Sequence, residues 1–371
     1  MRAASSLSAA FTIAVIAIWL PACAGKSEDG PTILAGMDPA TGALPSGFPD
    51  PRPRGPDTND PILLPYRGPG SGGIAYRLTL EIEGERSARR SPGNKQQPAV
   101  REAHALEAEF RMLPVEGTDS GNDMFLLGLD ALYYTQKQQN PPFERIIELA
   151  DDRLRIKING ETSIDNRGNR VIGPLAPRAF LNRIFGVFTL DPSGNPIKLS
   201  SRGAPAAREF LNGIPILGAI AYTMVSLPEE PITPGSRWTG VRVPASRSGE
   251  LGLGLTINYT LAGFELFENA TCAMILIDAR IDENAFTGLT GLEFNHVQAT
   301  LNGTAWVELE NSLVRRVVLS DQIRASWVSP GKAETATEYR IQHTSKLELV
   351  LRDPHRKSKK WSDGTSHFEN R

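Results

Sequence analysis

The chain has 371 residues, with 40 lysines and arginines against 42 aspartates and glutamates, and its formal net charge at pH 7 is −2. A chain of this length can bury a sizeable apolar core. The near balance of charge provides no basic face of the kind that nucleic-acid-binding proteins present, so the composition argues against a nucleic-acid partner.

Residues 1–22 predict a signal peptide. Arg2 precedes an apolar run from Ala9 to Leu20, which is shorter than the roughly 20 apolar residues that a membrane-spanning helix needs. The run ends in Leu-Pro-Ala-Cys, which resembles the lipobox of bacterial lipoproteins, where the cysteine is lipidated and becomes the mature N-terminus. The resemblance implies lipidation of Cys23, export and membrane lipid as a partner. The alternatives are an ordinary cleaved signal peptide and an uncleaved anchor.

The residues after Cys23 favour one of the two membranes. In bacterial lipoproteins an acidic residue directly after the cysteine often retains the protein at the inner membrane. The sequence continues with Ala24 and Gly25, so we expect the outer membrane.

Residues 23–74 are rich in proline and glycine, which disfavour helices and central strands, so we expect a disordered tether. At the other end, residues 353–371 form a basic polar tail; a solvated tail is our interpretation, and contact with anionic lipid or polysaccharide is the alternative. If Cys23 carries lipid, Cys272 has no disulfide partner. Cys272 lies in an apolar run and is expected to be a buried thiol.

Residues 75–352 show long stretches in which apolar and polar residues alternate, as in 76–82, 253–261, 297–309 and 339–351. This period is typical of antiparallel strands with one buried and one wet face. Because the stretches are longer than ordinary strands, we expect a mainly β fold, a large curved antiparallel sheet, half-barrel or barrel. Alternatively, residues 75–352 form two lobes, 75–203 and 229–352, which the helix 204–228 joins.

The expected helix covers residues 204–228, where apolar residues recur with helical spacing and charges are few. Pro205 suits the first turn, and Gly213 and Pro215 are expected to kink or divide the helix. Such a helix needs a sheet to cover, so we expect it over the concave face, with a ligand cavity beneath it. The candidate lining residues are Phe210, Ile214, Leu217, Ile220, Met224 and His343.

His343 is the titratable residue that stands out, because the alternation places it on the inward face of the last strand. A hydrogen-bonded core histidine is the plainer interpretation, and a polar contact in a ligand cavity is the alternative. The sequence contains no catalytic motif and no histidine pair with metal-ligand spacing, so we predict no metal, no cofactor and no enzymatic activity.

Residues 227–238 read LPEEPITPGSRW, and they are followed by strand-like segments at 258–263 and 301–307. This combination resembles an uncharacterised group of β-rich bacterial cell-envelope lipoproteins, whose signature is a proline-flanked turn, a glycine, and a tryptophan that opens a strand. The resemblance spans about residues 75–350. It implies the architecture and no activity, since none is established for the group.

The four residues of this signature have a structural explanation. Pro231 and Pro234 stiffen the turn, and Gly235 permits a positive φ. Trp238 would anchor the returning strand.

Two functional hypotheses remain. In the first, a lipid-anchored, non-enzymatic envelope protein holds an apolar or amphipathic ligand between sheet and helix. In the second, a structural or interaction lipoprotein contacts an envelope protein or other partner through its exposed sheet faces. A dry cavity under residues 204–227 would favour the first hypothesis, and a core filled by side chains would favour the second.

Overall fold

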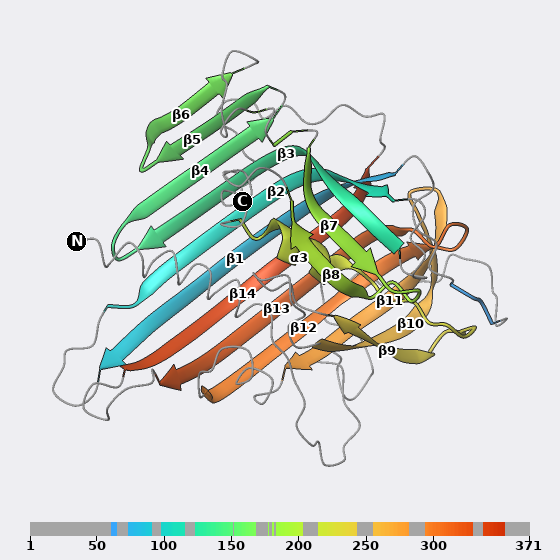
Figure 1. Cartoon of the computed structure of the whole chain (residues 1–371). Coiled ribbons are helices and arrows are strands. Elements are labelled where there is room, and N and C mark those ends of the chain that lie inside the picture. The colour runs from blue at the N-terminus through green and yellow to red at the C-terminus, as the bar shows by residue number, and fades with distance from the viewer. Residues whose placement is uncertain are drawn as a thin grey trace.

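The computed structural model describes residues 61–64, 73–90, 98–115, 123–150, 152–167, 177, 180–181, 183–202, 214–242, 255–281, 294–328 and 337–352. The signal-peptide residues 1–22 and the tail 353–371 lie outside these ranges. Within them, fourteen strands and the helix α3 (Ile216–Thr223) form one architecture (Figure 1). The strands are β1 (Ile74–Arg90), β2 (Val100–Pro114), β3 (Asp123–Gln139), β4 (Phe143–Ala150), β5 (Arg153–Ile158), β6 (Glu161–Arg167), β7 (Ile184–Leu190), β8 (Pro196–Ser201), β9 (Arg237–Arg242), β10 (Leu255–Phe267), β11 (Ala270–Ile281), β12 (Phe294–Glu308), β13 (Val314–Val328) and β14 (Thr337–Arg352).

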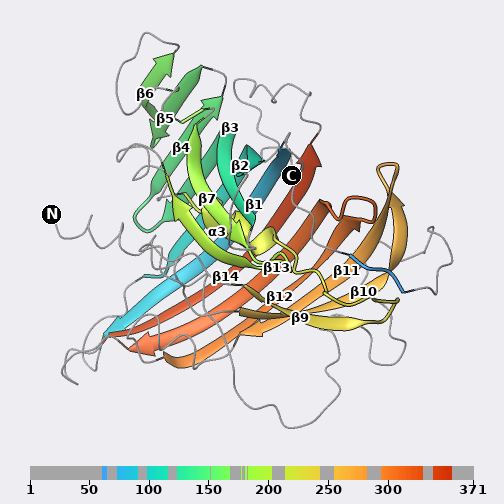
Figure 2. The same cartoon turned by 45° about the vertical axis from the view of Figure 1, so that its right-hand side comes forward.

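All fourteen strands belong to one antiparallel sheet, and twelve of them follow the order β6-β5-β4-β3-β2-β1-β14-β13-β12-β11-β10-β9. The long strand β3 also pairs with β7, which leads to β8. The sheet is open and strongly curved, and β7, β8 and α3 lie on its concave face (Figure 2). This confirms the predicted fold class. The two alternative lobes are parts of a single sheet, because β1 pairs with β14 along its whole length.

Local turn chemistry forms two of the hairpins. Asn159 and Gly160, which join β5 to β6, have φ values of 51° and 83°, the left-handed pair that a tight hairpin requires. Asp191 organises the β7–β8 turn, because its Oδ1 accepts bonds from the backbone N–H groups of Ser193 and Asn195.

Within the described residues 214–228, the predicted helix is corrected to the eight residues of α3. Pro215 stands at its N-terminal boundary, and Met224 is already extended, with φ −71° and ψ 139°. The extended segment that follows makes bonds to other elements: the Leu227 N–H donates to the Ser193 carbonyl at 2.8 Å, and the Trp238 indole donates to the Ser226 carbonyl at 2.9 Å. These hydrogen bonds satisfy backbone groups of Ser226 and Leu227 that would otherwise bond within a longer helix. Residues 204–213 lie outside the described ranges.

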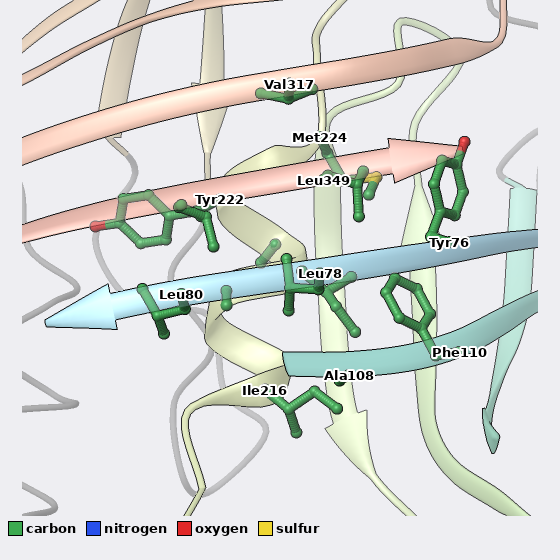
Figure 3. Close-up of a cluster of buried hydrophobic side chains, with 14 of the residues drawn as sticks. Tyr76, Leu78, Leu80, Ala108, Phe110, Ile216, Tyr222, Met224, Val317 and Leu349 are labelled. Carbon is green, nitrogen blue, oxygen red and sulfur yellow. The ribbon is translucent and has the colours of Figure 1, made fainter. Parts of the chain in front are cut away.

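The core fills the space between the concave face and α3. Figure 3 shows Ile216, Tyr222 and Met224 lying over Leu78 and Leu349 of the two central strands. All five side chains are buried. Packing of this kind, with each large side chain fully or nearly removed from water, is the main source of stability for a sheet with one dry face.

Part of the predicted tether packs on the module, which corrects the boundary of the segment 23–74. Ile62 and Ile232 exchange backbone hydrogen bonds at 2.9 and 2.7 Å, and Leu64 is buried in the core. The reason is that residues 61–64 carry an apolar cluster that the Pro/Gly count of the segment conceals.

One stretch of the outer face is drier than the alternation predicts. Trp306, expected on the wet face, is buried because Phe267 stacks on it at 5.8 Å and Arg316 lies 5.4 Å from the ring centre. Cys272 belongs to this small outer cluster. It is a buried free thiol as expected, and burial raises its pKa to about 11.

Candidate functional site

The predicted ligand-lining residues fall in two different places. Ile214, Ile220 and Met224 are buried members of the core, and Leu217 is half-buried and packs against it. They therefore fill the space in which a ligand was expected. Phe210 lies outside the described residues. His343 belongs to the other place: it lies on β14 opposite Gly84, towards the C-terminal end of β1.

The signature turn, residues 227–238, leads into the edge strand β9. Gly235 has φ 90°, and its N–H donates to the Leu261 carbonyl at 2.7 Å. Trp238 stacks on the buried Tyr259 at 5.6 Å. Pro231 and Pro234 flank the bridge that Ile232 makes to Ile62, so this turn holds the edge strand β9 against the core.

At one end of the sheet the inner face changes from apolar to polar. The strand register places Tyr134, Leu106, Leu80, Leu347 and Leu319 in one row across β3, β2, β1, β14 and β13. The next row towards that end contains Gln136, His104, Ile82, Ser345 and Asp321, and the row after it contains Gln138, Glu102, Gly84, His343 and Ile323. We call the polar members of these two rows, together with Arg86 and the hydroxyl of Tyr134, the inner polar layer.

Four residues on β1, β2 and β3 form the first half of the inner polar layer. Arg86 Nη2 lies 2.7 Å from Glu102 Oε1, and His104 Nδ1 shares a hydrogen bond of 2.8 Å with the Tyr134 hydroxyl. Burial alone would raise the pKa of Glu102, but neighbouring His104 and Arg86 overcome it and lower this pKa below its ordinary value. Burial raises the pKa of Tyr134 to about 12. Glu102 is therefore an ionised, compensated carboxylate.

The second half lies on β13 and β14. Burial raises the pKa of Asp321 to about 7, although hydrogen bonds from Ser345 oppose the shift. Burial, helped by the nearby His104, lowers the pKa of His343 to about 4. His343 Nε2 lies 3.9 Å from Asp321 Oδ1. Near neutral pH His343 is thus uncharged, and Asp321 titrates in this range.

A small pocket of about 30 Å³ opens between these halves, lined by both apolar residues such as Ile82, Val100 and Ile341 and polar residues such as Arg86, Glu102 and His343. Its volume corresponds to about one water molecule. The inner polar layer can thus hold solvent, and it is too tightly filled in this conformation for an organic ligand.

The same strands carry a much larger groove of about 870 Å³. Most of its described lining residues alternate with those of the inner polar layer and therefore face outward; we call this the outer groove. These outward residues are Glu83, Glu85, Ser87, Arg101, Ala103, Lys137, Gln139, Arg324, Ser326, Arg340, Gln342 and Thr344. Most of them are exposed, whereas the inward His104 and His343 are buried.

The outer groove spans five adjacent strands, β3, β2, β1, β14 and β13, at the end where the β1 and β13 arrows finish in Figure 1. One row across it reads Gln139, Arg101, Glu85, Gln342 and Arg324. At the usual strand spacing this row is about 19 Å long. The arrangement offers many hydrogen-bonding side chains along a line, which suits binding of an extended polar chain.

Sequence reasoning missed the outer groove and most of the inner polar layer. The alternation identified the two faces, including the inward His343, but it could not show that residues from positions 83–103 lie beside residues from 324–344. The signal that was present is a run of polar residues at inward positions, Glu102 and His104 on β2 and His343 and Ser345 on β14.

In the part of the chain that the structure describes, no group of three or more His, Cys, Asp or Glu side chains is arranged to hold a metal ion. The one described helix, α3, is too short to cross a membrane.

No family model and no curated protein matches the sequence. Among solved structures, the chain is similar to lipovitellin, described for its lipid–protein interactions, at 10% identity and a TM-score of 0.39, over 79% of this chain and 26% of that one. It is also similar to OpdQ of Pseudomonas aeruginosa, at 5% identity and a TM-score of 0.16, over 75% and 99%. A third is the translocator domain of the autotransporter NalP from Neisseria meningitidis, at 8% identity and a TM-score of 0.15, over 74% and 89%.

Proposed function

We propose that this protein is a lipid-anchored, non-enzymatic interaction protein of the bacterial cell envelope, which contacts its partner through the outer face of its sheet. The outer groove is the observation that supports this choice of contact surface. It has a volume of about 870 Å³ and is lined mostly by exposed polar side chains of five neighbouring strands. The anchor is supported by the signal-like residues 1–22 and Cys23.

A ligand held between sheet and helix has less support, because Ile216, Ile220 and Met224 pack directly onto the sheet. If they complete a filled core, Ile220→Ala should cost about 2–5 kcal/mol of unfolding free energy through the cavity it leaves. The wild type should then bind no apolar fluorescent probe. Probe binding by the wild type that Ile220→Ala alters would favour the ligand hypothesis instead.

The anchor is tested separately from the contact surface. Cys23→Ser should abolish incorporation of labelled fatty acid, and the protein should become soluble or keep its signal segment. Labelling that persists in the variant contradicts the lipidation site. Fractionation of the wild type should place it in the outer membrane, and recovery in the inner membrane would correct that part of the proposal.

The contact surface is tested by photo-crosslinking in intact cells. A photoreactive amino acid replaces Gln342 or Thr344 in the outer groove, or the control residues Ser320 and Asn258, which are exposed outside it. We expect specific crosslinked products from the groove positions and none from the controls. Equal crosslinking from all four positions, or none from the groove, contradicts the proposal.

A further inference from the structure

We propose that the partner of the outer groove is a hydroxyl-rich polysaccharide chain of the envelope; this inference rests on the proposed function and names the chemistry of its partner. The chain would lie across the five strands, along the row from Gln139 to Arg324.

The chemistry of the side chains is the first argument. Gln139, Gln342 and Arg324 present planar groups with several hydrogen-bonding atoms each. Ser87 and Thr344 add hydroxyls, which both donate and accept. Such groups match the hydroxyls of sugars, and they recur from strand to strand at a nearly constant spacing. An extended polymer can therefore meet them in succession.

The lack of an apolar centre is the second argument. Stable protein–protein interfaces have a dry core enriched in aromatic residues and methionine. Among the described lining residues the apolar side chains are Ala103, Ala325 and Ile341, and the last two face the core. Among its described residues, the outer groove therefore provides no anchor of the kind that a folded protein partner would need.

The charge balance is the third argument. Three of the four basic side chains among the described lining residues have acidic partners: Arg101 Nε lies 2.9 Å from Glu85, Lys137 Nζ 3.4 Å from Glu144, and Arg340 Nη2 2.9 Å from Glu338. Arg324 and Glu83 add one charge of each sign. A surface with nearly cancelling charges does not attract polyanions over a distance, which favours a hydroxyl-rich chain of low charge density.

The test measures binding of the full mature chain, kept in detergent, to two purified polysaccharides. One is the peptidoglycan glycan strand freed of its stem peptides, and the other is the lipid-free polysaccharide of lipopolysaccharide. We expect one of them to bind, and the arm that binds identifies the source. The double variant Arg324→Ala/Gln342→Ala should weaken binding about tenfold through the lost hydrogen bonds. The matched control Ser320→Ala/Asn258→Ala should bind like the wild type.

Several outcomes overturn the inference. The inference is wrong if the wild type binds neither polysaccharide. It is also wrong if the double variant Arg324→Ala/Gln342→Ala has the melting temperature of the wild type and binds the polysaccharide equally well. Groove-specific crosslinked products that polysaccharide hydrolases leave unchanged, and in which mass spectrometry finds peptides of a second protein, would show a protein partner; the proposed function would then stand and the polysaccharide would be wrong. If the groove positions give no specific crosslinks at all, both the proposed function and the polysaccharide partner are rejected.

Discussion

The two faces of the same sheet end are built by alternate residues of the same strands, yet they differ in almost every physical property. On the inner face, Arg86 and Glu102 pair with side-chain exposures of 19% and 10%. On the outer face, Arg101 and Glu85 pair between the same two strands with exposures of 69% and 48%. One residue of displacement along a strand thus moves an ion pair from a nearly dry setting into water.

The comparison assigns stability to the inner face of this sheet end and partner contacts to its outer face. The inner polar layer is buried, so its groups are tied to one another and any change in charge acts on folding. The outer groove is hydrated, so its side chains can change partners at little cost to the fold. Substitutions on the two faces should therefore produce opposite patterns in stability and binding.

The largest expected effect is on the buried pair. Arg86→Gln should reduce the unfolding free energy by about 3–5 kcal/mol, because it leaves the Glu102 carboxylate buried without its main cationic partner. Chemical denaturation measures this loss. The double variant Arg86→Met/Glu102→Met should recover much of the stability, and a double variant no more stable than Arg86→Gln would show that the charge is not the cause.

The next effect concerns Asp321 and depends on pH. Its pKa is about 7 in the folded protein against an ordinary 3.8, so the folded state retains a proton that the unfolded chain releases, and stability contributed by this group falls as pH rises from about 4 to 7. Asp321→Asn removes this loss. Relative to the wild type, the variant should gain about 3–4 kcal/mol between pH 4 and pH 8. A stability difference that does not change with pH would contradict the assignment.

His343 should show the opposite pH dependence. Its pKa is about 4 in the folded protein against an ordinary 6.5, so the unfolded chain binds the proton first and stability falls as pH drops from about 6.5 to 4. His343→Gln should reduce this acid sensitivity by about 2–3 kcal/mol. Denaturation curves at pH 7 and pH 4.5 measure it, and an imidazole that titrates near pH 6.5 by NMR would disprove the shift.

The smallest expected effect is on the outer pair. Arg101→Gln should change the unfolding free energy by less than about 1 kcal/mol, because both partners are exposed and screened by solvent. The matched comparison with Arg86→Gln uses the same substitution on the other face. A loss of several kcal/mol on Arg101→Gln would show that the outer groove is part of the stabilising structure.

The sequence predicted the architecture well because alternation is a local property that a half-buried strand must have. Tyr76 to Ile82 and Ile341 to Leu349 show their buried faces without knowledge of their partners. The C-terminal end of the helix was overestimated, because helical spacing in residues 204–228 does not reveal that Ser226 bonds to β9 and Leu227 to the β7–β8 turn. The candidate site could not be assembled, since the register that joins Glu85 to Gln342 brings together the two ends of the module.

That register also has a consequence for the order in which the molecule can form. β1 opens the sheet in the chain and β14 closes it, with Ala75 opposite Arg352, and the pair occupies the middle of the sheet. Until the last strand has been synthesised, β1 has an unpaired edge and the two sheet halves cannot join. Contacts of such sequence separation form slowly, and exposed edges invite wrong pairing. A truncation that removes β14 should therefore aggregate, even though every other strand is intact.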